Sequence, residues 1–121
     1  MDNELIEFAK QAIDKCFDSE KWLHTVGCAV RGKSGKIYTG VNIDGIHGSC
    51  AEVIALGAAI SCGETQFDTI VAVYGKGRDQ KIIPPCGNCR QIMFELDSQI
   101  NVIVDDNTTI SIKELLPYPC L

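Results

Sequence analysis

Two segments of the sequence are the most informative about the fold and the chemistry of the protein: CAEVIALGAAI at residues 50–60 and PPCGNCRQIMFEL at residues 84–96. Both contain a cysteine near their start and continue with apolar, helix-forming residues, so we expect helices that begin near Cys50 and near Cys86. The first of these helices is apolar nearly all round, which predicts that it is buried. The two prolines of the second segment delay its helix until the cysteine that follows them.

The flanking sequence alternates between helical and strand patterns. Apolar residues recur at helical spacing over residues 2–17, and a helical turn over residues 111–116 opens with a capping-box spacing. Four strands are expected, at residues 26–31, 36–43, 69–74 and 102–104. The resulting order, α-β-β-α-β-α-β-α, predicts one α/β domain over residues 1–121, a three-layer α/β/α sandwich with a mixed central sheet.

Three cysteines at the two helix starts form a candidate metal site. Cys86 and Cys89 are three residues apart, so both sulfurs project to one side of their helix start. If the strands before the two helices are neighbours, the Cys50 sulfur joins them at one edge of the sheet. Thiolates bind zinc readily, and a helix N-terminus stabilises a thiolate. Three protein ligands with one open position are typical of a catalytic zinc ion.

Glu52 is the candidate proton carrier of that site. It lies two residues beyond Cys50, so its side chain leaves the helix on a different face and is free to serve a water molecule instead of the metal. A zinc ion makes water a stronger acid, and a nearby carboxylate can then move the proton. The pattern therefore predicts a zinc-dependent hydrolase with Glu52 as its catalytic residue.

The cysteines also leave other interpretations open. His47, Cys28 or Cys62 can serve as a fourth ligand, which would make the zinc site structural and the protein non-catalytic. The CGNC spacing at residues 86–89 also occurs in thioredoxin-like redox sites, although that role leaves the segment around Glu52 unexplained. A binding or scaffold protein that has kept the fold without the activity is a further alternative.

Composition and charge narrow the range of partners. The formal charge is −5, with 11 basic against 16 acidic residues, and the basic residues are scattered, which argues against a nucleic-acid partner. No apolar run approaches the roughly 20 residues that span a bilayer, so we expect no membrane partner. The acidic N-terminus does not match a signal peptide, and the seven cysteines, an odd number, do not suggest a disulfide framework. We therefore expect a cytoplasmic protein.

The two motifs, Cys50-Ala51-Glu52 and PCGNCRQ at residues 85–91, resemble those of the free-nucleoside cytidine deaminases and the related blasticidin-S deaminases. Further segments look like the family in the same order, namely VGCA at residues 26–29, KIYTGVNI at residues 36–43 and ELLP at residues 114–117. In effect the resemblance covers the whole chain. It implies the cytidine deaminase fold and the hydrolytic deamination of a free cytidine-like nucleoside, such as cytidine or deoxycytidine, to the uridine analogue and ammonia.

The resemblance also assigns roles to single residues. It implies that Cys50, Cys86 and Cys89 hold a zinc ion, and that Glu52 passes a proton from water to the ring and then helps the amine to leave. Residues expected to contact the substrate are Asn42, Asp44, His24, Ala51 and Tyr118. Family active sites borrow residues from neighbouring subunits, so the resemblance implies a homotetramer whose activity depends on assembly. The expected partners are therefore a small nucleoside and further copies of the chain.

Three positions depart from the family pattern. Asp44 stands where the nucleoside enzymes usually have Glu for contact with ribose, and His24 stands where they tend to have Phe. His24 resembles one blasticidin-type branch, so blasticidin S or another aminopyrimidine compound is the alternative substrate. Val53 replaces the Arg that many three-cysteine members have after the catalytic Glu, which leaves the negative charge of the thiolates without that cation.

Overall fold

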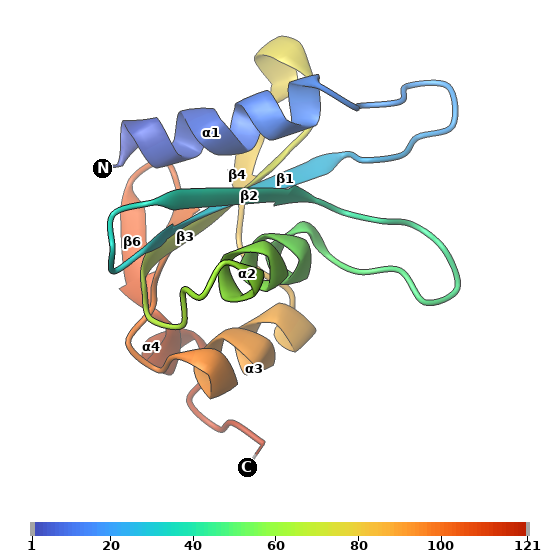
Figure 1. Cartoon of the computed structure of the whole chain (residues 1–121). Helices are drawn as coiled ribbons and strands as arrows, with labels where there is room; N and C mark the ends of the chain where they lie inside the picture. Colours follow the sequence, from blue (N-terminus) through green and yellow to red (C-terminus); the bar gives the residue numbers. More distant parts are fainter. Residues whose placement is uncertain (1, 121) are drawn as a thin grey trace.

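The computed structural model describes residues 2–120, in which four α-helices surround a sheet of six strands (Figure 1). The helices are α1 (Asn3–Asp14), α2 (Ala51–Ser61), α3 (Gly87–Leu96) and α4 (Ile112–Leu115), with one 3-10 turn, η1 (Gly77–Asp79). The strands are β1 (Val26–Gly32), β2 (Ile37–Val41), β3 (Phe67–Tyr74), β4 (Lys81–Ile83), β5 (Asn101–Asp105) and β6 (Thr108–Ser111).

The sheet is mixed and has the strand order β2-β1-β3-β5-β6. Strand β3 lies at its centre, because it pairs with β1 along one edge and shares the other edge between β5, at residues 69–71, and β4, at residues 72–74. The β3–β5 pair is parallel, and the other strand pairs within residues 2–120 are antiparallel. Strand β3 carries a nearly continuous apolar run, as expected of a strand that is covered on both faces.

Helices cover both faces of the sheet, which confirms the predicted three-layer α/β/α arrangement (Figure 1). On one face, α1 packs on a cluster that includes Ala29 and Val71. On the other face, α2, α3 and α4 enclose a larger cluster that includes Cys28 and Val30. Alternate residues of β1 therefore face opposite layers, because successive side chains of a strand point to opposite sides of its sheet.

Two glycines allow the helices to lie close to the sheet. A Cβ atom at Gly40 of β2 would be 2.5 Å from the backbone nitrogen of Ala55 in α2. A Cβ atom at Gly27 of β1 would likewise collide with the backbone of Ala9 in α1. Any larger residue at these two positions would push a helix away from the sheet. Glycine at position 40 therefore helps to set how close α2 lies to the sheet.

The sequence pattern does not predict β4 or β6. Strand β4 has three residues and ends directly before Pro84, and β6 has four residues and follows a polar turn at residues 106–107, so neither carries a full strand pattern. These strands form because β3 and β5 offer them unpaired edges. Each pairs with the strand that precedes it in the sequence, so it depends on the edge that this strand offers more than on its own short pattern.

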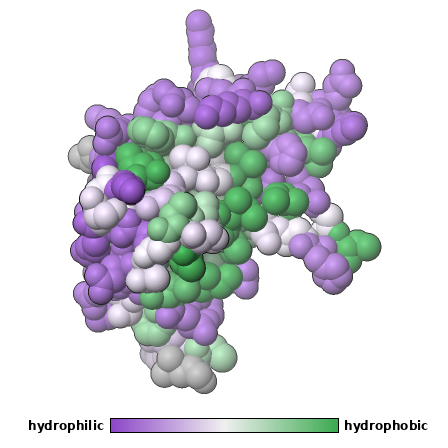
Figure 2. All heavy atoms as spheres, in the orientation of Figure 1, coloured by the Kyte–Doolittle hydropathy of each residue, from purple (hydrophilic) through white to green (hydrophobic). Residues whose placement is uncertain are grey.

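Helix α2 is buried on one face only, so the prediction of a fully buried helix is wrong for a single copy of the chain. Its inner face includes Ala55, Leu56 and Ala59, whereas Ile60 on the outer side is 39% exposed. Figure 2 shows apolar side chains gathered over α2 in the middle of this face of the molecule. Even this apolar helix is too short to span a bilayer, and no other helix within residues 2–120 has the length and apolar character for it.

Candidate active site

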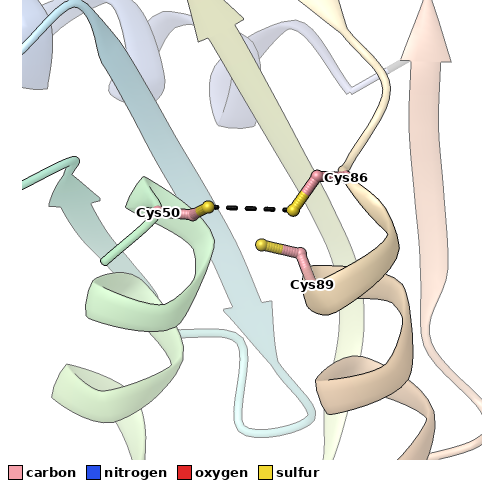
Figure 3. A group of neighbouring side chains, drawn as sticks. All are labelled: Cys50, Cys86 and Cys89. Carbon is pink, nitrogen blue, oxygen red and sulfur yellow. Dashed lines mark hydrogen bonds between the residues drawn. The ribbon is translucent and has the colours of Figure 1, made fainter. Parts of the chain in front are cut away.

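The N-termini of α2 and α3 bring three cysteine side chains together (Figure 3). Cys50 is the N-cap of α2 and Cys86 is the N-cap of α3, both with extended backbone angles. Cys89 lies in the first turn of α3 and projects to the same side as Cys86. The three sulfurs point toward one another from the two helix starts, so the structure brings the three predicted ligands into one cluster.

The three Sγ atoms lie within 4.8 Å of one another, and those of Cys50 and Cys86 are 3.7 Å apart. Cys89 is buried at the base of this cluster, whereas Cys86 is exposed. The three sulfurs are therefore close enough to bind one ion, and the cluster is open toward solvent on one side.

No fourth ligand joins this cluster from the part of the chain that the structure describes. Within residues 2–120, it is the only group of three or more His, Cys, Asp or Glu side chains whose ligand atoms lie so close together. His47, Cys28 and Cys62, the candidates for a fourth ligand, are not part of it. A site with three ligands keeps one coordination position for water, as catalytic zinc sites do and structural ones do not.

The acidity of the thiols fits a metal ion in this cluster. Burial raises the pKa of Cys50 and of Cys89, and the Glu52 carboxylate raises the pKa of Cys89 further. Burial also acts to raise the pKa of Cys86, but hydrogen bonds from the backbone N–H groups of Cys89 and Asn88 and from the neighbouring thiols lower it. Three such thiols do not ionise together without a cation, because their negative charges repel. The donor set therefore suits zinc, which binds thiolates in this number.

Glu52 lies beside the cluster as a buried carboxylate. It belongs to the first turn of α2, and its side chain is only 5% exposed. Burial raises the pKa of its carboxyl group, while its own backbone N–H and the Cys89 thiol act in the opposite direction. A carboxyl group with a raised pKa takes up and releases protons more readily near neutral pH. Glu52 is therefore suited to proton transfer.

A cavity of about 500 Å³ opens beside the thiols and Glu52, a volume typical of small-molecule sites. Its wall is formed by the start of β1, the segment that follows β2, the start of α2, and the end of β4 with the residues that follow it. The site residues expected from the sequence that line this cavity are Asn42, Asp44, Cys50, Ala51, Glu52 and Cys86. The structure thus brings most of the predicted substrate residues next to the thiol cluster.

His24 and Tyr118 are not among the described residues that line the cavity. The His24 ring lies against Asn42, with its Nδ1 atom 2.9 Å from the Asn42 carbonyl oxygen. Tyr118 is 93% exposed, and the tail that carries it is held on α3 by two hydrogen bonds between Cys120 and Gln91. Direct contact of either side chain with the substrate therefore stays a prediction.

Arg90 supports the site in a way that the sequence does not reveal. Its Nε atom donates to the carbonyl oxygen of Pro85 at 2.9 Å, and its Nη1 atom donates to the carbonyl oxygen of Leu115 at 3.2 Å. The guanidinium group thereby ties the segment that carries Cys86 to α4. The sequence shows only that a basic residue follows Cys89. It does not reveal the contact of Arg90 with Leu115, because these residues are 25 positions apart along the chain.

Known proteins resemble this chain along most of its length. The family model described as the cytidine and deoxycytidylate deaminase zinc-binding region matches residues 1–105. The blasticidin-S deaminase of Bacillus cereus is 36% identical over 127 residues, which cover 96% of this chain and 89% of that protein. The cytidine deaminase of Halalkalibacterium halodurans is 36% identical over 100 residues, which cover 76% of this chain and 74% of that protein.

Solved structures show the same fold. The crystal structure of the cytidine deaminase from Burkholderia pseudomallei matches with a TM-score of 0.81 and 31% identity over 99% of both chains. That of the cytidine deaminase from Mycobacterium tuberculosis matches with a TM-score of 0.81 and 25% identity over 97% of this chain and 94% of that chain.

A zinc-binding family model and a three-thiol cluster beside a buried carboxylate define this molecule as a zinc-dependent hydrolase. The chain belongs to the cytidine and deoxycytidylate deaminase family. The family predicted from the two cysteine motifs is therefore confirmed.

Replacing Cys86 with alanine should weaken zinc binding and lower the thermal stability together. Loss of a residue that only supports a ligand lowers metal affinity roughly 10- to 100-fold, so loss of a ligand itself should lower zinc affinity further. The stability should fall as well, because metal binding contributes to the free energy of unfolding. Zinc content after dialysis against a chelator, and the melting temperature with and without chelator, measure both effects. His47→Ala is the control and should keep one zinc per chain. Full zinc retention by Cys86→Ala would remove it from the ligand set, and zinc loss by His47→Ala would reveal a fourth ligand.

Replacing Arg90 with methionine should speed zinc release, because the segment that carries Cys86 loses its two anchoring hydrogen bonds. We expect about a tenfold faster transfer of zinc to a colorimetric chelator, the effect of losing an outer partner of a metal site. Arg78→Met is the matched control, since Arg78 is exposed on η1 outside the cavity. Equal release rates for the two variants would mean that Arg90 does not support the site.

Proposed function

We propose that this protein deaminates a free cytidine-like nucleoside by hydrolysis and releases the uridine analogue and ammonia. The observation that carries the proposal is a three-thiol cluster at the wall of a cavity, with no fourth ligand among the described residues and with the buried Glu52 beside it. Relatives and solved structures named as cytidine deaminases support the substrate class. The net charge of −5 favours a free nucleoside over a polynucleotide.

We propose that Cys50, Cys86 and Cys89 hold one zinc ion. When bound, the ion supplies Lewis acidity at the cavity wall and lowers the pKa of water there. The spacing of the three sulfurs within 4.8 Å supports this assignment, as does the match to a zinc-binding family model. Cys50 and Cys86 both line the cavity, so an ion that they held would act on a molecule bound there.

Glu52 is the proposed proton carrier. In the reaction, a water oxygen bonds to ring carbon C4, the bond between C4 and the amino nitrogen breaks, and ammonia leaves. A carboxylate oxygen of Glu52 accepts a proton from the attacking water and delivers it to ring N3. It then moves the proton of the new C4 hydroxyl group to the departing amino group. Two features of Glu52 support this role, its place on the cavity wall and a pKa that burial raises.

Asn42 and Asp44 are proposed to bind the sugar. Both line the cavity, and the Asn42 Oδ1 atom accepts a hydrogen bond from the Val26 backbone N–H at 3.0 Å, which leaves its NH2 group to donate. The Asp44 carboxylate accepts hydrogen bonds. A sugar hydroxyl both donates and accepts, so it complements this pair. Ala51, also on the cavity wall, is proposed to contact the pyrimidine ring.

Blasticidin S is the second candidate substrate, and a specific observation favours it. The blasticidin-S deaminase of Bacillus cereus matches 96% of this chain at 36% identity. Position 44 carries an aspartate, one methylene shorter than the glutamate that the nucleoside enzymes usually have, which leaves room at this position for a group other than ribose. Pockets that hydrogen-bond a substrate hydroxyl discriminate strongly, so the two candidates should differ clearly in kcat/KM.

The experiment that tests this proposal is ammonia release by the zinc-loaded protein from cytidine, deoxycytidine and blasticidin S side by side. We expect turnover of the two nucleosides with the higher kcat/KM. A clear preference for blasticidin S would select the second candidate. No release from any of the three by the zinc-loaded protein would contradict both.

Glu52→Gln is the control variant for this assay. The amide has nearly the same shape but cannot carry the proton, so turnover should fall by roughly 100- to 10,000-fold. Zinc content and melting temperature should stay close to those of the unaltered protein. Retained turnover would remove Glu52 from the mechanism.

We propose that the active protein is a homotetramer in a reducing, cytoplasmic compartment, where it serves pyrimidine salvage. Two exposed apolar surfaces support assembly: the outer face of α2 and Ile46, which lies at the cavity and is 97% exposed. Burial of apolar surface between subunits is favourable. Seven free cysteines support the compartment. Light scattering should give four times the chain mass of 13.2 kDa. A fully active monomer would contradict the assembly.

A further inference from the structure

Three hydrogen bonds fix Asn42 at the cavity wall. Its backbone N–H donates to the Val26 carbonyl oxygen at 3.2 Å, and its side-chain Oδ1 accepts from the Val26 N–H at 3.0 Å. The third bond joins its carbonyl oxygen to the Nδ1 atom of His24 at 2.9 Å. The side-chain NH2 group of Asn42 has no partner within residues 2–120, and Asn42 lines the cavity. This NH2 group is thus held ready to donate to a ligand.

His24 adopts a backbone conformation that favours glycine. Its φ angle is 57°, and Trp22, with a φ angle of 58°, is the one other non-glycine residue within residues 2–120 that has a positive value. A left-handed conformation is unfavourable for a residue with a Cβ atom and persists where the surroundings demand it, often at functional sites. Here it accompanies the contact between the His24 ring and Asn42.

The contact also defines the protonation of the ring. A carbonyl oxygen only accepts hydrogen bonds, so the Nδ1 atom of His24 has to carry the proton that it shares with Asn42. In the neutral ring, Nε2 is then the unprotonated nitrogen, since the hydrogen bond of one nitrogen selects the tautomer. The phenylalanine that the nucleoside enzymes tend to have at this position offers no such donor.

We propose that His24 is a positioning residue, which holds Asn42 so that its NH2 group donates to a hydroxyl oxygen on the sugar or sugar-like part of the substrate. This inference rests on the proposed function, because it concerns how the same cavity recognises that part. His24 acts through Asn42 and needs no contact of its own with the substrate, in keeping with its absence from the described cavity wall. Its loss should therefore affect KM more than kcat, since the reacting ring atoms lie at Glu52.

A pair of variants separates the hydrogen bond from the backbone conformation. Asparagine and aspartate both tolerate positive φ angles and have nearly the same shape, but only asparagine keeps an N–H donor on Cγ, where histidine has Nδ1. We expect His24→Asp to raise KM about tenfold at nearly unchanged kcat, the effect of one lost hydrogen bond. We expect His24→Asn to stay close to the unaltered protein. Equal KM values for the two variants would overturn the proposal.

A double-mutant cycle tests whether His24 acts through Asn42. Asn42→Ala removes the donating NH2 group and should raise KM by itself. If His24 only positions that group, His24→Asp should raise KM no further in the Asn42→Ala protein. Additive effects on KM would mean that His24 contributes independently and would overturn the proposal. If His24 were merely structural, His24→Asp would lower the melting temperature both with and without Asn42→Ala, and its effect on KM would not depend on Asn42.

The tautomer gives a readout that does not depend on turnover. The sequence has two histidines, so His47→Asn leaves His24 as the single histidine, and its ring nitrogens can be assigned by 15N NMR at a pH where the ring is neutral. We expect the Nδ1–H tautomer, and the Nε2–H tautomer would overturn the proposal. His47→Asn is also the activity control, because His47 is exposed and outside the described cavity wall.

These measurements distinguish the two failures. If the substrate panel shows turnover but His24→Asp leaves KM unchanged, the positioning role fails and the proposed function stands. If the panel shows no turnover at all, the proposed function fails, and the proposed recognition of a substrate sugar fails with it. The Nδ1–H tautomer would then still support the His24–Asn42 contact as a structural one.

Discussion

The site depends on one geometric constraint, which is that two helices begin at the same end of one sheet. Strand β2 leads toward Cys50 and β4 leads to Cys86, and both helices pack on the same face of the sheet. Helix starts have unpaired backbone N–H groups, so they can stabilise thiolates that an apolar core would not. Gly40 contributes directly, because only a residue without a Cβ atom lets α2 lie this close to β2.

Charge is the second constraint, because three thiolates and one zinc ion together carry an excess negative charge. Val53 supplies no cation after Glu52, and the Arg90 guanidinium group is directed to the carbonyl oxygens of Pro85 and Leu115. The backbone N–H groups of α3 lower the pKa of Cys86 instead. Fixed backbone dipoles thus stabilise charge here, and the arginine holds the segment that presents them.

The two ends of the cavity are built differently. The end proposed for the reacting ring is formed by helix starts, where packing against the sheet fixes Cys50 and Glu52. The end assigned to the sugar is a loop after β2, closed by paired hydrogen bonds between Ile43 and Ser49 and held on one side by the contact between His24 and Asn42. Loops accept substitution more readily than packed helix starts, so one chemistry can serve several substrates within one family.

Elements with a local pattern can be predicted from the sequence, including the helices after Cys50 and Cys86 and the apolar strand β3. The sequence also places Glu52 with the cysteines, through motifs that resemble those of a known family. Features that need a partner outside the local pattern follow only from the tertiary structure. Strands β4 and β6 form because sheet edges are available to them, and α2 is exposed on the side where nothing in one chain covers it. The Arg90 side chain donates to the carbonyl oxygen of Leu115, 25 residues further along the chain. The His24 ring contacts Asn42, and strands β1 and β2 lie between these two residues in the sequence. Periodicity and spacing carry information about neighbours along the chain, whereas these contacts exist only after the sheet has brought distant segments together.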